Sequence, residues 1–135
     1  PNAKLAAAFF SLGLPPDGGA TWLLPRLVGT QKAKRFFFNN ETWTGKMALD
    51  YGAVDELADS EDLLLRAIEV AERWGQWSES SRKYTKQLID ASTSTFMETQ
   101  LEFEKLLITN SSLTSDFAEG VSSFLDKRKP NFGEE

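Results

Sequence analysis

The stretch FFSLGLPPDGGATWLLPRLVG, from Phe9 to Gly29, joins an apolar run, a turn rich in proline and glycine, and a short helical pattern. Two consecutive prolines end the apolar run, which favours a buried strand or a tight connection over a long helix. Asp17 follows them in a position where its side chain could cap the first N–H groups of a helix. We therefore predict a turn at Asp17 and a short helix that ends before Gly29.

Two further short helices are predicted between this stretch and residue 58. The segment 30–38 places three apolar side chains at helical spacing among polar ones, namely Ala33, Phe36 and Phe37. Thr44 can cap the next helix, and Gly52 can end it. Residues 53–57 alternate enough between apolar and polar types to predict a brief strand.

The pattern changes near residue 58, after which helical periodicity continues almost to the end of the chain. Four helices are predicted, and their starts are placed near Asp59 or Ser60, at Ser78, near Thr95, and near Ser115 or Asp116. Asp116 and Glu119 have the spacing of a capping box, and Pro130 is the expected stop of the last helix. The predicted fold class is mostly α with short β elements, divided into the segments 1–58 and 59–135.

The composition excludes several kinds of chemistry. The 135 residues include no histidine and no cysteine, so imidazole bases, Ser-His-Asp triads, thiolate nucleophiles and sites that bind metal through His or Cys are excluded within this chain. A net charge of -5 argues against nucleic-acid binding, which depends on lysines and arginines at phosphates. No apolar run approaches the roughly 20 residues of a membrane span. Proton transfer would have to use carboxylates, lysines or tyrosines.

Three ordered blocks resemble the crotonase, or enoyl-CoA hydratase/isomerase, family: the stretch already quoted, TGKMALDYGAVDEL at 44–57, and SDFAEGVSSFLDKRKPNF at 115–132. The resemblance implies the C-terminal half of such a protein. Residues 1–58 would be the end of the ClpP/crotonase spiral fold, and residues 59–135 the α-helical trimerisation region. The start at Pro1, followed at once by buried-type sequence, is what we expect of a fragment or a processed product.

The same resemblance singles out Asp17 as the catalytic residue. Family members that shift a double bond can carry their working acid at the aspartate of a Pro-Asp turn, which matches Asp17. Hydratases of the family use two glutamates, and the position that matches the second is occupied here by Phe9. A carboxylate near Phe9 and Trp22 would be partly desolvated, as a general base requires. The alternative role for Asp17 is a helix cap.

A second candidate site lies in FLDKRKPNF, at 124–132. Phe124 and Lys127 are three residues apart, so on a helix they could share a face, stack on a base and meet a phosphate. The alternative is a solvated helix end, where cations complement the helix dipole. The resemblance implies that this helix reaches the nucleotide of CoA, often that of a neighbouring subunit.

The predicted function is a double-bond shift in an enoyl-CoA thioester by the native-length protein, while the 135-residue chain alone is expected to be inactive. The resemblance places both N–H groups of the oxyanion hole, and most of the CoA pocket, upstream of this chain. CoA would enter as part of the substrate, with no metal or redox cofactor. The expected assembly is a homotrimer or a dimer of trimers, and the expected location is cytoplasmic, or mitochondrial or peroxisomal in a eukaryote. The alternatives are a hydratase and a non-catalytic acyl-CoA-binding or assembly module.

Overall fold

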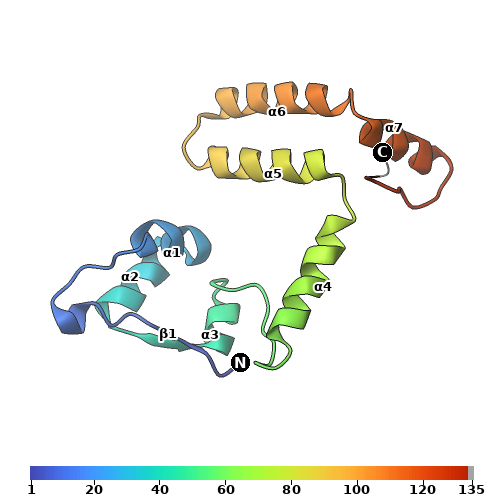
Figure 1. The fold of residues 1–135 in the computed structure, drawn as a ribbon. Coiled ribbons are helices and arrows are strands. Elements are labelled where there is room, and N and C mark those ends of the chain that lie inside the picture. The colour runs from blue at the N-terminus through green and yellow to red at the C-terminus, as the bar shows by residue number, and fades with distance from the viewer. Residues whose placement is uncertain (134–135) are drawn as a thin grey trace. The chain divides into compact units, whose positions relative to one another are not determined.

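The computed structural model describes residues 1–133, which are mostly helical and include one two-stranded sheet (Figure 1). Contacts divide the chain into two compact units, Pro1–Arg66 and the residues from Ala67 onward. The elements in order are β1 (Lys4–Ala6), a 3-10 turn (Phe10–Leu12), α1 (Ala20–Val28), α2 (Thr30–Phe38), β2 (Thr42–Thr44), α3 (Gly45–Asp50), α4 (Leu63–Gly75), α5 (Glu79–Ser92), α6 (Met97–Ser111) and α7 (Ser115–Leu125). The prediction of a mostly α fold with short β elements is confirmed.

The sheet of the first unit pairs β1 with β2 in antiparallel register, and Leu5 lies opposite Trp43. The predicted strand at 53–57 is wrong. Instead, the backbone N–H groups of Ala53 and Val54 both donate to the carbonyl oxygen of Ala48, at 2.8 and 3.3 Å. These two bonds satisfy a carbonyl at the C-terminal end of α3, so this segment closes a helix and does not join the sheet.

An aromatic core holds the first unit together. Trp43 is fully buried, and its ring lies 4.2 Å from that of Phe36 and 5.0 Å from that of Tyr51, measured between ring centroids. The indole N–H of Trp43 donates to a carboxylate oxygen of Glu41 at 2.8 Å, and this bond is the largest cause that lowers the pKa of Glu41. The indole therefore buries its ring while its polar atom keeps a partner.

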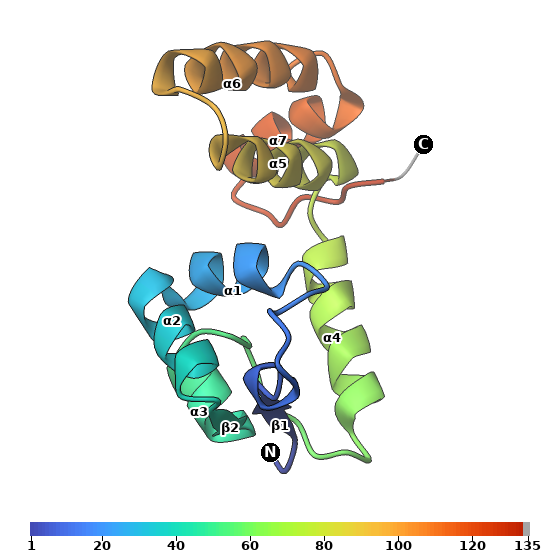
Figure 2. The ribbon, with the colours of Figure 1, turned by 90° about the vertical axis from the view of Figure 1, so that its left-hand side faces the viewer.

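The helix predicted at 30–38 is confirmed as α2, and the three residues named from its spacing are its buried ones. It packs against α1, as Figure 2 also shows. Gly29 separates the two helices with a φ of 82°, a conformation that residues with a Cβ rarely adopt. The predicted stop at Gly29 is therefore also confirmed.

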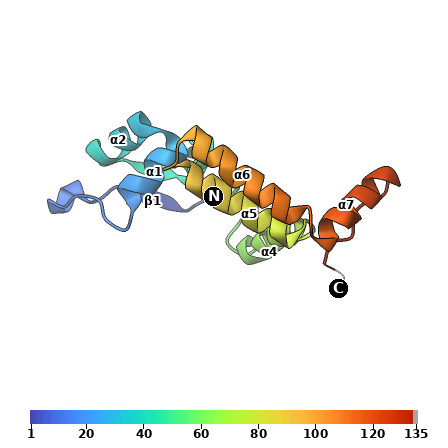
Figure 3. The same ribbon diagram turned by 90° about the horizontal axis from the view of Figure 1, so that it is seen from above.

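In the second unit, α5 and α6 lie side by side (Figure 3). The side chain of Gln100 joins them, because its amide nitrogen donates to the carbonyl oxygen of Leu88 at 2.9 Å. Its amide oxygen accepts from the hydroxyl of Thr95 in the connecting turn at 3.0 Å. Within α4 to α7, all of which are described, Ser123 is the one buried residue, so the apolar faces of these helices are exposed.

The predicted helix caps have mixed outcomes. The hydroxyls of Thr44 and Ser78 do accept from the N–H three residues on, as predicted. The capping box of Asp116 and Glu119 is wrong, because the hydroxyl of Thr114 caps α7 by accepting from the N–H of Phe117 at 3.2 Å. The starts predicted near residues 59 and 95 come too early, since α4 begins at Leu63 and α6 at Met97, and α7 ends five residues before Pro130.

Candidate functional site

Asp17 lies in the first unit, in a tight turn directly before α1. Its carbonyl oxygen accepts from the N–H of Ala20 at 2.9 Å, and the two residues between them, Gly18 and Gly19, have φ values of 58° and 81°. Two consecutive positive φ angles define a type I′ turn, which glycine adopts without strain. The predicted turn at Asp17 is confirmed.

The prediction that Asp17 caps α1 is wrong. The cap position is Gly19, whose carbonyl oxygen accepts from the N–H groups of Trp22 and Leu23, and no side chain caps this helix. The type I′ turn adds two residues between Asp17 and the helix, and this moves the carboxylate out of capping reach. Asp17 is exposed in this chain, so the expected desolvation by its apolar neighbours is not found within the described residues.

An apolar hollow of about 280 Å³ lies beside this turn in the first unit. Pro16, the residue before Asp17, forms part of its wall. Ala33 and Phe37 of α2 also line it. Asp17 is therefore the next residue in the chain after one that lines an apolar hollow. A carboxylate close to an apolar hollow suits a substrate with an apolar tail and an acidic proton.

The second candidate site lies at the end of α7. The helix ends at Leu125, and Lys127 follows with a φ of 54°. The prediction that Phe124 and Lys127 share a helical face is therefore wrong. The N–H of Lys127 donates to the carbonyl oxygen of Phe124 at 3.3 Å, and the N–H of Arg128 donates to that of Ser123 at 3.0 Å. These two bonds form a Schellman motif, with Lys127 at the left-handed position that is usually glycine.

An ion pair fixes the chain directly after Lys127. Both terminal nitrogens of Arg128 donate to the two carboxylate oxygens of Glu119, at 2.5 and 2.8 Å, and the backbone N–H of Asn131 donates to Glu119 at 2.8 Å. The bonds from Arg128, and then the bond from Asn131, lower the pKa of Glu119 to about 2. Paired donors of this kind are stronger than single neutral hydrogen bonds.

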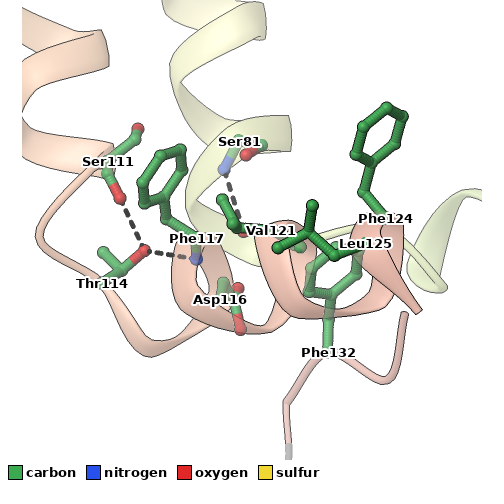
Figure 4. Close-up of a pocket in the computed structure, with 11 residues that line it drawn as sticks. Ser81, Ser111, Thr114, Asp116, Phe117, Val121, Phe124, Leu125 and Phe132 are labelled. Atoms are coloured by element: carbon green, nitrogen blue, oxygen red, sulfur yellow. Dashed lines mark hydrogen bonds between the residues drawn. The ribbon is translucent and has the colours of Figure 1, made fainter.

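Figure 4 shows the pocket beside α7, whose volume is about 400 Å³. Most of its lining is apolar, and its residues include Val121, Leu125 and Phe132. Phe132 packs against Gly120 at 3.8 Å, measured to the place where a Cβ would stand. The ring of Phe124 points away from α7 and is 81% exposed, so it remains accessible to a planar ligand.

The sequence did not identify Glu119 as part of this site, because it was assigned to a capping box. Glu119 lies nine residues from Arg128 and twelve from Asn131. Both partners follow the end of α7, so helical spacing does not predict these contacts. Residues 1–133 contain no cluster of three or more His, Cys, Asp or Glu side chains that could hold a metal ion. In the same range, no helix is both long and apolar enough to cross a membrane.

A profile of the enoyl-CoA hydratase/isomerase family matches residues 1–135. The chain belongs to this family. The resemblance of the three sequence blocks to crotonases is thereby confirmed.

Curated relatives within the enoyl-CoA hydratase/isomerase family include 1,2-epoxyphenylacetyl-CoA isomerase of Escherichia coli K12, which is 33% identical over 131 residues, 97% of this chain and 50% of the relative. Trans-2-decenoyl-acyl-carrier-protein isomerase of Streptococcus mutans is 31% identical over 135 residues, 97% of this chain and 50% of the relative. The 2,3-dehydroadipyl-CoA hydratase of E. coli K12 is 30% identical over 131 residues, 97% of this chain and 51% of the relative. The chain spans about half the length of the curated relatives it matches.

Solved structures of the family agree with this relationship. An enoyl-CoA hydratase/isomerase from Cupriavidus metallidurans CH34 aligns with a TM-score of 0.86 at 31% identity, over 98% of this chain and 51% of its own. An enoyl-CoA hydratase from Bacillus anthracis aligns with a TM-score of 0.88 at 28% identity, over 98% of this chain and 52% of its own. The predicted crotonase fold, represented by half of its length, is confirmed.

Proposed function

We propose that the native-length protein carrying this chain moves the double bond of an enoyl-CoA thioester, with Asp17 as the proton carrier. The observation that carries the proposal is the turn at Asp17. The carboxylate is exposed on a turn fixed by two glycines, and Gly19 performs the capping role that would otherwise have explained it. Phe9 stands where the resemblance places the second glutamate of a hydratase, which favours isomerisation over hydration.

The reaction needs no reagent besides the substrate. In a 3-enoyl-CoA, the carboxylate of Asp17 removes a proton from the carbon beside the thioester carbonyl, and the electron pair of that C–H bond enters a dienolate. The double bond then lies next to the carbonyl, and the acid returns the proton two carbons further along the chain. The negative charge on the thioester oxygen would be held by backbone N–H groups, which the resemblance places outside this chain.

Phe124 and Lys127 would bind the nucleotide end of CoA. The exposed ring of Phe124 offers a stacking face for the adenine, and the ammonium of Lys127 can pair with a phosphate. The N–H of Lys127 bonds to the carbonyl of Phe124, so the two residues are held close together although they do not share a helical face.

Assembly as a homotrimer or a dimer of trimers is part of the proposal. The exposed apolar side chains of the second unit support it, because amphipathic helices need a surface to cover them. They include Trp74, Ile89, Leu101, Phe103, Leu106 and Val121. We further propose that the protein acts in the cytoplasm, or in the mitochondrion or peroxisome of a eukaryote, with CoA as its only cofactor-like group.

The test is ultraviolet absorbance during incubation of a 3-enoyl-CoA with the native-length protein, because conjugation of the double bond with the thioester adds absorbance that the substrate lacks. We expect turnover by the wild type and its loss in Asp17→Asn, which keeps the size of the side chain and removes the base. Equal turnover by both proteins would assign the proton transfer to another acid.

The second candidate function is hydration, favoured by the similarity to 2,3-dehydroadipyl-CoA hydratase of E. coli. A hydratase would consume the conjugated 2-enoyl-CoA in water, so its absorbance would fall. Incubating the wild type with each substrate separately distinguishes the two reactions. A protein that binds acyl-CoA and turns over neither substrate would be a binding or assembly module.

A further inference from the structure

Lys127 occupies a backbone conformation that its residue type disfavours. Among the residues that the structure describes, two that are not glycine have a positive φ: Asn40 at 51° and Lys127 at 54°. Asparagine tolerates this region, because its short side chain bonds to the local backbone, but lysine does not have that advantage. Strain of this kind persists where surrounding contacts enforce it, and it is concentrated at functional positions.

Besides the two backbone bonds of the Schellman motif, an ion pair one residue later ties this backbone to α7. Glu119 lies on α7 and binds Arg128 through two hydrogen bonds, and it also accepts from the N–H of Asn131. Because Arg128 and Asn131 are both tied to the helix, the backbone between Leu125 and Arg128 has to reverse within a few residues. We call the set Glu119, Arg128 and Asn131 the α7 clasp.

Within the α7 clasp, the positive charge of Arg128 is balanced by nearby carboxylates. Arg128 lies near two carboxylates, that of Glu119 and that of Asp126, the latter at 3.5 Å. Its charge is therefore largely neutralised within the protein. Lys127 and Lys129 are both exposed. Lys127 is bonded through its backbone N–H to Phe124, so its ammonium is the one that can act together with the Phe124 ring.

We propose that the α7 clasp positions Lys127 for the phosphates of CoA, with Glu119 as the residue that holds it there. The inference rests on the proposed function, since it takes CoA as the ligand. In this account Glu119 touches neither substrate nor reacting atoms, and it is a positioning residue. Breaking the clasp lets Lys127 relax to an ordinary right-handed or extended backbone, and the ammonium leaves its place.

The size of the effect follows from the cost of the left-handed conformation. A non-glycine residue disfavours that region by a factor of roughly ten in population. When the competent state falls to a fraction of the molecules, the apparent affinity falls by the same fraction. Loss of the clasp should therefore weaken binding through the phosphates by about tenfold, and the chemical step should not change.

The experiment compares Glu119→Gln with the wild type in the native-length protein, using a 3-enoyl thioester of CoA and the same thioester of pantetheine, which lacks the nucleotide. Glu119→Gln should raise KM for the CoA substrate about tenfold, leave kcat unchanged, and leave the pantetheine substrate unaffected. The matched control is Glu102→Gln, which breaks an exposed pair with Lys105 on α6 and should change neither substrate.

Equal losses with both substrates, or no change with either, would overturn the inference. Arg128→Lys is the second variant, because it keeps the charge and loses the two-pronged geometry, and it should raise KM for the CoA substrate alone. If the wild type turns over neither substrate, the proposed reaction is rejected, and calorimetric binding of CoA itself decides the inference. Glu119→Gln should then bind CoA about tenfold more weakly than wild type; equal binding, or no binding by the wild type, would refute the role of the clasp.

Discussion

Replacing Lys127 by glycine should make the protein more stable and weaken its binding of CoA. At a φ of 54°, Lys127 carries the cost of a left-handed backbone, about 1–2 kcal/mol for a residue with a Cβ. Glycine escapes this cost but loses more backbone entropy on folding, about 0.5–1 kcal/mol. The net gain in the free energy of unfolding for Lys127→Gly should therefore be about 0.5–1 kcal/mol.

Lys127→Ala is the matched control, because it also removes the ammonium and retains the strain. Both variants should bind CoA more weakly than the wild type by a similar factor, while only Lys127→Gly should gain stability. The assay is urea unfolding of the native-length protein at a fixed concentration, with CoA affinity measured by calorimetry on the same preparations. Equal urea midpoints for the glycine and alanine variants would show that the left-handed backbone at this position carries no strain, and the reasoning would be refuted.

Three further predictions concern the fold and its pH dependence. Trp43→Ala should cost about 3–5 kcal/mol of unfolding free energy, because it empties the centre of the aromatic core, whereas Trp43→Phe should cost less; urea midpoints measure both. Thr44→Val should cost about 1 kcal/mol by removing the cap of α3, and Thr44→Ser should retain it, so equal midpoints for the two would contradict the cap. Folding lowers the pKa of Glu119 from 4.5 to about 2, so its contribution to stability is complete above about pH 4.5 and is lost as pH falls toward 2. The urea midpoint of Glu119→Gln should accordingly fall less steeply than that of the wild type between pH 4.5 and pH 2, and parallel curves would count against the lowered pKa.

Helices with a periodic apolar face were predictable from the sequence. The bounds of α2 and its buried residues followed from 3.6-residue spacing, because a helix that packs on one side repeats its apolar positions. The caps at Thr44 and Ser78 were predictable for a similar reason, since a hydroxyl needs only the N–H three residues on. Local chemistry was sufficient for these elements.

Features that depend on contacts distant in the sequence were not predictable. The strand β2 has three residues and is defined by its partner β1, about 40 positions away, so its own pattern carries almost no signal. Residues 53–57 had a better strand pattern, yet the N–H groups of Ala53 and Val54 close α3. A local pattern predicts a strand only if a partner strand is present.

The candidate site was predictable in part. The resemblance located Asp17, Phe124 and Lys127, and their roles stay predictions. The geometry around them was not accessible from the sequence, because two glycines moved the cap of α1 away from Asp17, and the ion pair of Glu119 joins residues nine positions apart. The left-handed backbone of Lys127 belongs to the Schellman motif that ends α7, and lysine itself gives no signal for it.

The most direct test of Asp17 as proton carrier is deuterium exchange. The native-length protein is incubated with a 3-enoyl-CoA in heavy water, and NMR follows deuterium entering the product at the carbon that receives the proton, two positions beyond the carbon beside the thioester carbonyl. The wild type should catalyse this exchange, and Asp17→Asn should lose it while retaining the urea midpoint of the wild type and its affinity for CoA. Exchange at the wild-type rate in Asp17→Asn would contradict the assignment and would place the working acid elsewhere.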